Sequence, residues 1–166
     1  GTGSVAIGRK ALLAQNFTTA TTSFNTAVGI VAGTSITTGI QNTLIGGIAG
    51  DALTDADENV AVGYAALSGD TLGSKSTAIG HAALATQNFT TATDSNNTAV
   101  GYNAGTAVTT GTSNTLLGTQ AGDALTTGSE NVAVGVQALS TEDAHGQNTA
   151  VGQQALRDLN AGATGN

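Results

Sequence analysis

The sequence predicts an all-β fold, a parallel β-solenoid with coils of 17 and 21 residues. One observation is an eight-residue motif, typified by residues 97–104, that occurs nine times, because fixed short periods indicate stacked repeat units. A second is an aromatic content of only 3%, which is too low to fill a wide globular core. The third is 24 Gly and no Pro in a Thr-rich chain, which favours short strands joined by tight turns. The motif copies begin at Ser4, Asn25, Asn42, Asn59, Ser76, Asn97, Asn114, Asn131 and Asn148.

A longer repeat is superimposed on the short one. Residues 4–75 and 76–147 are identical at 44 of 72 aligned positions, and a ninth copy of the motif follows at 148–156. We therefore expect residues 1–156 to form a single solenoid domain. Residues 157–166 lose the pattern and are expected to be a tail or the start of a further domain. Because the chain begins inside a repeat without Met, we expect it to be a piece of a longer protein.

Each motif contains a short strand with two apolar faces. Its second and fourth positions are β-branched or aliphatic, and its third is Ala or Leu. Successive residues of a strand point to opposite sides, so both faces should be covered. The pattern leaves open which face fills the coil, but the small, uniform third position favours contact with another copy of the chain. The candidate interface residues are Ala6, Ala27, Ala61, Ala78, Ala99, Ala133 and Ala150.

The rest of each coil follows from the motif's remaining positions. Gly at the fifth position should end the strand, either through positive φ or because a Cβ has no room. The Ala at the eighth position begins a second apolar segment, where we expect a second strand. Five copies continue with Leu at the ninth position, whereas four have Gly there and regain an aliphatic residue three positions later, at Ile36, Leu53, Val108 and Leu125. First-position Asn side chains should hydrogen-bond from coil to coil as a structural ladder.

The repeated motif Asn/Ser-Thr/Val-Ala-Val/Ile-Gly-x-x-Ala resembles the head repeats of trimeric autotransporter adhesins. It is also similar to repeats of bacteriophage tail-fibre and virion-appendage proteins. The resemblance covers residues 4–156. It implies a left-handed parallel β-roll, three chains winding about a common axis, and an extracellular location at a cell surface or on a virion.

Composition limits the partners and the chemistry. A net charge of −7 and only 4 Lys and Arg disfavour binding to nucleic acid. No apolar run is long enough to cross a bilayer, and no Cys is present for a thiolate metal site. His81 and His145 replace Arg9 and Gly73 of the first unit, so the repeat requires neither. We expect no enzymatic activity, no cofactor and no metal site.

An acidic group is the one candidate for cation binding. Asp51, Asp55, Asp57 and Glu58 lie close together in the sequence, but their spacing is not that of an EF-hand loop. We interpret them as solvated corner residues, and the sequence leaves Ca²⁺ binding open.

The two long coils hold every Phe of the chain. A buried Phe would seal a longer corner, whereas an exposed Phe beside Thr and Asn suits stacking on sugars. The candidate receptor-binding residues are Phe17, Phe24, Phe89, Thr18 and Thr90. We expect a homotrimeric, extracellular fibre module that presents these loops to a host or glycan receptor.

Two alternatives remain. One is an architectural filament unit without a ligand, and the other is a Thr-rich ice-binding solenoid. The position of the regular Thr argues against ice binding, because the second motif position shares its face with the aliphatic fourth position and is expected inside the coil or at an interface.

Overall fold

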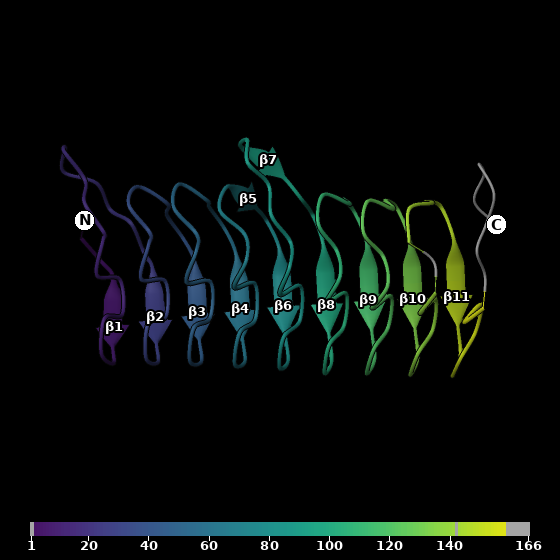
Figure 1. The fold of residues 1–166 in the computed structure, drawn as a ribbon. Helices are drawn as coiled ribbons and strands as arrows, with labels where there is room; N and C mark the ends of the chain where they lie inside the picture. Colours follow the sequence, from purple (N-terminus) through teal and green to yellow (C-terminus); the bar gives the residue numbers. More distant parts are fainter. Residues whose placement is uncertain (1, 142, 159–166) are drawn as a thin grey trace.

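The computed structural model describes residues 2–141 and 143–158 and forms a rod of stacked coils. Nine three-residue strands pair in parallel, in chain order, into one sheet along the rod, and two shorter strands pair beside it (Figure 1). The strands of the main sheet are β1 (Val5–Ile7), β2 (Thr26–Val28), β3 (Thr43–Ile45), β4 (Val60–Val62), β6 (Thr77–Ile79), β8 (Thr98–Val100), β9 (Thr115–Leu117), β10 (Val132–Val134) and β11 (Thr149–Val151). The smaller pair is β5 (Gly73–Ser74) and β7 (Thr93–Asp94). Of the expected tail, only Arg157 and Asp158 lie within the described residues.

The strand register follows the sequence repeat. Thr26 pairs with Thr43, Ala27 with Leu44, and Val28 with Ile45, and the other pairs of the main sheet match motif positions in the same way. The predicted parallel all-β solenoid is therefore confirmed.

The third motif position faces the interior of the coil. Ala27, Leu44 and the corresponding residues of the later strands are at most 1% exposed. They pack with the Ala of the eighth position and with the aliphatic residue of the ninth or twelfth position, including Ile36, Leu53, Val108 and Leu125. The predicted displacement of the aliphatic side chain is thus confirmed.

This packing corrects the candidate interface between chains. Ala27, Ala61, Ala78, Ala99, Ala133 and Ala150 are buried inside their own chain and cannot contact another, while Ala6 is exposed in the first coil. An Ala side chain at the third position is small because the coil is narrow, not because a second chain approaches it.

Two leucines compensate for the glycines at the ninth position. A Cβ added at Gly33 would lie 2.7 Å from Leu44 Cδ1, and one added at Gly50 would lie 2.8 Å from Leu44 Cδ2. Leu116 lies in the same way between Gly105 and Gly122, at 2.6 and 2.7 Å. Each Leu therefore fills the space that two glycines leave open.

The expected second strand of each coil is not formed in the described residues. Positions seven and nine have positive φ, for example 56° at Ala65 and 53° at Leu67, and an extended strand requires negative φ. The apolar Ala of the eighth position therefore reaches the core from a tight turn. A residue with positive φ also precedes each Asn of the first motif position, for example Glu58 at 59°.

The predicted Asn ladder is confirmed. Asn25 Oδ1 accepts hydrogen bonds from Asn42 N at 2.9 Å and Asn42 Nδ2 at 3.2 Å, and Asn42 Oδ1 accepts one from Asn59 N. Asn42 Nδ2 also donates to the Ala56 carbonyl at 2.7 Å. Asn97, Asn114, Asn131 and Asn148 form the same chain of contacts in the second half of the rod.

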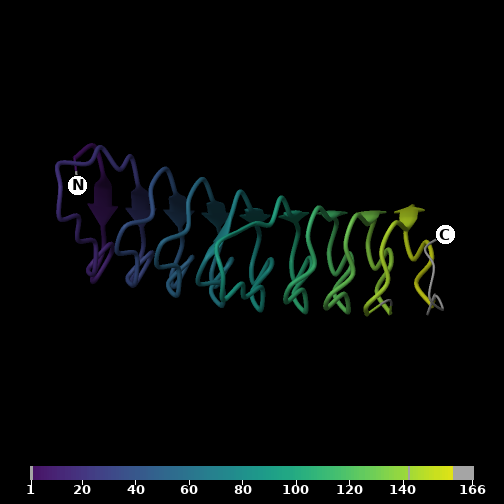
Figure 2. The same ribbon diagram turned by 90° about the horizontal axis from the view of Figure 1, so that it is seen from above.

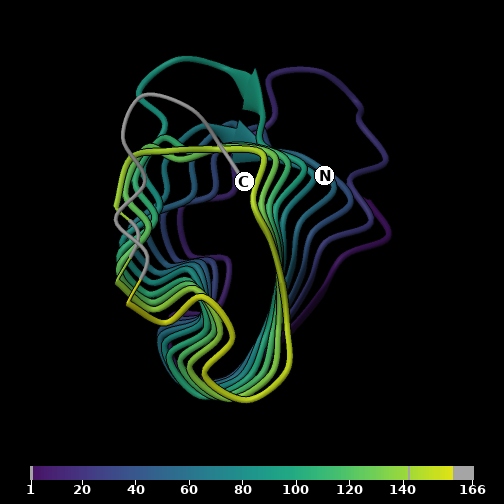
Figure 3. The same ribbon diagram turned by 90° about the vertical axis from the view of Figure 1, so that its right-hand side faces the viewer.

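Successive coils are rotated slightly about the rod axis. Seen along that axis, the strand segments fan out from the first coil to the last (Figure 3). From above, the strand arrows change from full length at the N-terminal end to strongly foreshortened toward the C-terminal end (Figure 2). The main sheet therefore twists along its length, as parallel sheets ordinarily do.

The fifth-position glycines are required by the close stacking of the coils. Gly46 has φ of 141°, and a Cβ there would lie 2.3 Å from the Gly63 carbonyl oxygen. A carbonyl oxygen of the backbone cannot move aside without breaking the adjacent strand pairing.

We therefore predict that Gly46→Ala destabilises the rod by at least about 2 kcal/mol, from the steric clash and from the strained φ. Gly47→Ala is the matched control, because its Cβ would meet nothing closer than the Tyr64 ring at 3.4 Å. Urea unfolding followed by circular dichroism measures both variants, and equal midpoints would contradict the assignment.

Candidate functional site

The main sheet exposes an apolar surface on its outer side. We call the residues of the second and fourth motif positions on the nine strands of the main sheet the outer sheet face. Ile7, Leu117 and Val151 are 59%, 46% and 68% exposed, and Ile45 and Ile79 are also exposed. In a single chain this face has no cover, although large contiguous apolar surfaces usually mark interaction sites. The outer sheet face is therefore the first candidate site.

The regular Thr residues of the second position also point outward. Six of the nine copies carry them, at Thr26, Thr43, Thr77, Thr98, Thr115 and Thr149. They are partly or fully exposed. Of the two places expected for these Thr side chains, the coil interior is wrong, because the third position occupies it, and an interface between chains stays a prediction.

A column of stacked rings follows the fifth-position glycines. The His81 ring lies between Tyr64 and Tyr102, with centroid distances of 5.4 and 5.3 Å and interplanar angles of 25°. All three side chains are exposed. None of the other six coils has an aromatic residue at this position, so the fold does not require rings here; the residues are Arg9, Ile30, Gly47, Thr119, Val136 and Gln153. Sequence analysis missed this cluster, although the shared motif position would have revealed it.

The second long coil carries a projecting loop. Residues 88–94 are called the long loop below. In the view along the rod they project outside the outline of the other coils (Figure 3). In Figure 1, β7 lies above β5, farther from the main sheet. Thr90, Thr91 and Ala92 are exposed at its tip. In the first unit, Thr2 and Thr22 form a corresponding isolated parallel bridge.

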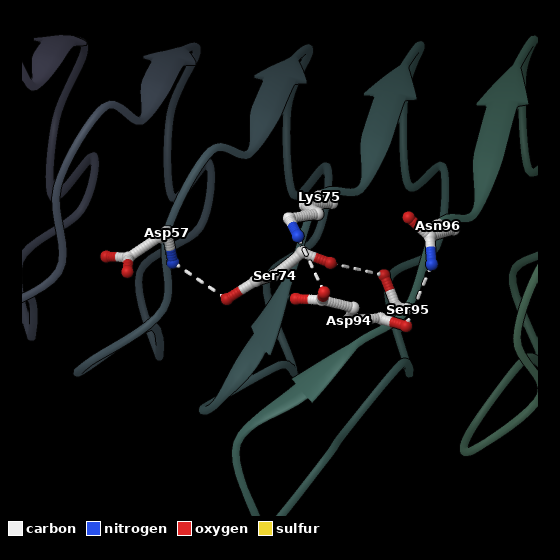
Figure 4. A network of polar contacts seen from close by, with 6 residues as sticks. All are labelled: Asp57, Ser74, Lys75, Asp94, Ser95 and Asn96. Carbon is white, nitrogen blue, oxygen red and sulfur yellow. Dashed lines mark hydrogen bonds and ion pairs between the residues drawn. The ribbon is translucent and has the colours of Figure 1, made fainter.

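A polar network joins the base of this loop to the preceding coils (Figure 4). Lys75 Nζ contacts Asp94 Oδ2 at 2.6 Å in an exposed ion pair, and this hydrogen bond raises the pKa of Lys75. Ser95 Oγ donates to the Ser74 carbonyl at 2.9 Å, and Ser74 Oγ accepts from Asp57 N at 2.9 Å. The loop therefore leaves the rod from a hydrogen-bonded base.

The predicted receptor residues have different environments. Phe89 is 6% exposed, and a Cβ added to Gly73 would lie 2.7 Å from its ring, so Phe89 seals the corner. Phe24 is 60% exposed and Phe17 is half-buried. Thr18 and Thr90 are both exposed. Phe89 is therefore not available to a receptor, whereas Thr18, Thr90 and Phe24 are.

The acidic corner residues do not converge on one point. Asp55 Oδ1 accepts a hydrogen bond from Thr38 Oγ1 at 2.6 Å, and Asp57 Oδ1 accepts one from Ile40 N at 2.7 Å. In residues 2–141 and 143–158, no three His, Asp or Glu side chains form a group that could hold a metal ion.

Two aspartates occupy equivalent places in the two units and have a buried oxygen each. Oδ1 of Asp51 and Oδ1 of Asp123 lack a hydrogen-bond partner. Burial raises the pKa of both carboxyl groups, although a backbone hydrogen bond partly opposes the rise. The folded rod therefore disfavours their charged forms.

The comparisons with known proteins give no relative: no family model, curated protein or solved structure matches this chain. Within the described part of the chain there is also no helix that could cross a membrane.

We predict that the double variant Asp51→Asn, Asp123→Asn unfolds at a higher temperature than the wild type at pH 7. A raised pKa in the folded state means that stability is lost as the pH rises through and above the ordinary range of an aspartate. The two melting temperatures should converge near pH 3, where the carboxyl groups are neutral in both states. A difference that does not change between pH 3 and pH 7 would contradict this assignment.

A second prediction compares two phenylalanines. Phe89→Ala should lower the free energy of unfolding by about 3 kcal/mol, because it removes a buried ring. Phe24→Ala should change it by only about 0.5 kcal/mol, since that ring is exposed. Urea unfolding measures both, and an unchanged stability of Phe89→Ala would show that its ring does not seal the corner.

Proposed function

We propose that this chain is a module of an extracellular fibre, on a cell surface or a virion, in which three copies form a shaft that presents projecting loops. The proposal includes a left-handed winding of the coils, which have 17 and 21 residues. It also includes a side-by-side arrangement of the three chains in the trimer. The uncovered outer sheet face is the observation that carries it. Its partner is another copy of the same chain.

The composition of the outer sheet face favours a permanent contact. Its fourth position is Val, Ile or Leu in all nine copies, and no charged residue occurs at the second or fourth position. Burying an exposed aliphatic side chain stabilises an interface by about 25 cal/mol per Å² of apolar surface before association costs are subtracted. Each of the nine strands contributes such a side chain, so the interface is long. A second rod with the same repeat spacing can match it along its length.

The twist of the sheet also favours association between identical chains. A partner must follow the rotation of the strands along the whole rod (Figure 2). Copies of the same chain have the same twist, so they can keep matching contacts by winding about a common axis. A rigid flat surface would meet only part of the face.

The projecting loops are the receptor-binding elements in this proposal. The tip residues Thr90 and Thr91, and Thr18 in the first unit, offer hydroxyl groups outside the rod. Such groups suit a polyhydroxylated ligand such as a glycan, and three copies of a weak site gain avidity in a trimer. A glycan array probed with the wild type and with Thr90→Ala, Thr91→Ala tests this assignment. Binding to no glycan would favour the architectural filament unit.

Ice binding is the second candidate, and the outward Thr column favours it. Thr26, Thr43 and Thr77 lie on the same exposed face as the aliphatic residues, so a monomer would display ranks of Thr and Val or Ile. Val5, Val60 and Val132 interrupt the Thr column, however, and the twist prevents a flat match to a crystal plane. Thermal hysteresis from a monomeric protein would support ice binding and contradict the trimer.

We predict that light scattering of the wild type gives three times the chain mass of 16.0 kDa. Ile79→Asp should give the mass of one chain, because a carboxylate on the outer sheet face would be buried without a partner. Thr110→Asp, at an exposed corner away from the sheet, is the control and should remain trimeric. A monomeric wild type would overturn the proposal.

A further inference from the structure

A buried polar cluster underlies the long loop. Asp70, Ser76, Gln87 and Ser95, called the loop latch below, are all 0% exposed. Asp70 and Gln87 occupy the twelfth coil position, where other coils place Ile36, Leu53, Val108 and Leu125 in the core. Burying these polar groups costs free energy unless each is hydrogen-bonded, so their contacts need an explanation.

Gln87 joins three parts of the structure. Its Nε2 donates to Asp70 Oδ2 at 2.6 Å and to Ser76 Oγ at 2.8 Å, while its Oε1 accepts from Asn97 Nδ2 at 2.8 Å. Ser76 replaces Asn at the first motif position and has no amide to continue the ladder. Gln87 therefore supplies the missing amide from the coil that carries the long loop.

Asp70 fixes the start of the loop. Its Oδ1 accepts hydrogen bonds from Gly73 N at 3.1 Å and Phe89 N at 3.0 Å. The Phe89 carbonyl in turn accepts from Leu72 N at 3.1 Å and from Thr71 Oγ1 at 2.8 Å. One carboxylate thus holds the loop backbone and the Gln87 side chain together.

Ser95 fixes the end of the loop. Its N donates to the Ser74 carbonyl at 2.9 Å, and its Oγ lies 2.5 Å from Ser76 Oγ. Because Ser76 also contacts Gln87, the two ends of the loop meet in one hydrogen-bonded group.

The first unit repeats part of this arrangement. Gln15 Nε2 donates to Ser4 Oγ at 3.3 Å and to Ser23 Oγ at 3.0 Å, and these two hydroxyl groups lie 2.7 Å apart. Gln15, Ser4 and Ser23 correspond to Gln87, Ser76 and Ser95. Both long coils therefore use a Gln and two Ser residues in the same arrangement, fully buried in the second unit and partly buried in the first.

We propose that Gln87 and Asp70 are positioning residues that hold the long loop in one conformation before any ligand binds. Ordering a loop on binding costs conformational free energy, and a loop fixed in advance avoids most of that cost. That the loop binds a ligand rests on the proposed function, whereas its fixed conformation does not. This arrangement favours a ligand that contacts the exposed hydroxyl groups of Thr90 and Thr91, which the rigid loop backbone holds in place.

Hydrogen exchange of the loop amides tests the proposal without a ligand. Gln87→Glu places two carboxylates together. Asp70→Asn places its NH₂ group against another donor, either Gln87 Nε2 or the N–H groups of Gly73 and Phe89. Each single variant should accelerate exchange of the Phe89, Thr93 and Ser95 amides by about tenfold or more, because it breaks a hydrogen bond to a charged group. In the double variant Asp70→Asn, Gln87→Glu, Asn Nδ2 can donate to the Glu carboxylate, so exchange should slow again toward the wild-type rate.

Leu125→Ala is the control, because it removes a core side chain at the same coil position in a coil without a long loop. It should lower the melting temperature and leave the exchange of residues 89–95 unchanged. Unchanged loop exchange in both single variants, no recovery in the double variant, or equal acceleration of the amides of β3 and β10 would each overturn the proposal. A monomeric wild type or an empty glycan array would instead count against the proposed function alone.

Discussion

Close stacking of the coil backbones is the constraint from which the other features of this rod follow. Backbone hydrogen bonds join neighbouring coils along most of each coil. The Gly46 and Gly63 backbones lie too close for a Cβ between them. At this distance each side chain lies beside the side chain of the same motif position in the next coil. A column of polar or aromatic side chains is then favourable only where its members attract one another. The amides of the Asn ladder do so through hydrogen bonds, and the rings of Tyr64, His81 and Tyr102 do so through stacking.

The long coils show how an inserted segment is accommodated without losing this stacking. The strands β6 and β8 pair in the usual register even though a longer segment separates them. The extra residues leave the rod at one corner (Figure 1), and the Phe89 ring is buried beside Gly73. Leu84 keeps the aliphatic place in the core of this coil, and polar side chains beneath the loop reconnect the amide ladder through Gln87. Insertion is thus confined to one side of the coil, and the outer sheet face remains continuous.

Much of the fold was predictable because the repeat fixes which residues are equivalent. The motif spacing predicted the parallel register of Thr26 with Thr43, and the displaced aliphatic residues predicted Ile36 and Leu53 as core. The two faces of the strand could not be distinguished, since both are apolar and the width of the coil interior is a three-dimensional property. The second strand was wrongly expected for a related reason, because apolar periodicity does not reveal the positive φ of Ala65. Likewise, the sequence located the long loops but did not show that Phe89 is buried and Phe24 exposed.

The column of Tyr64, His81 and Tyr102 gives this rod an internal optical reporter. The chain contains 2 Tyr and no Trp, so its intrinsic fluorescence arises almost entirely from two coils near the middle, which lie on either side of the His81 coil. Circular dichroism, by contrast, averages over every coil. Solenoids can unfold in segments because each unit contacts only its neighbours. Fluorescence and circular dichroism therefore coincide if the rod unfolds as a whole, and they separate if the ends unfold before the centre.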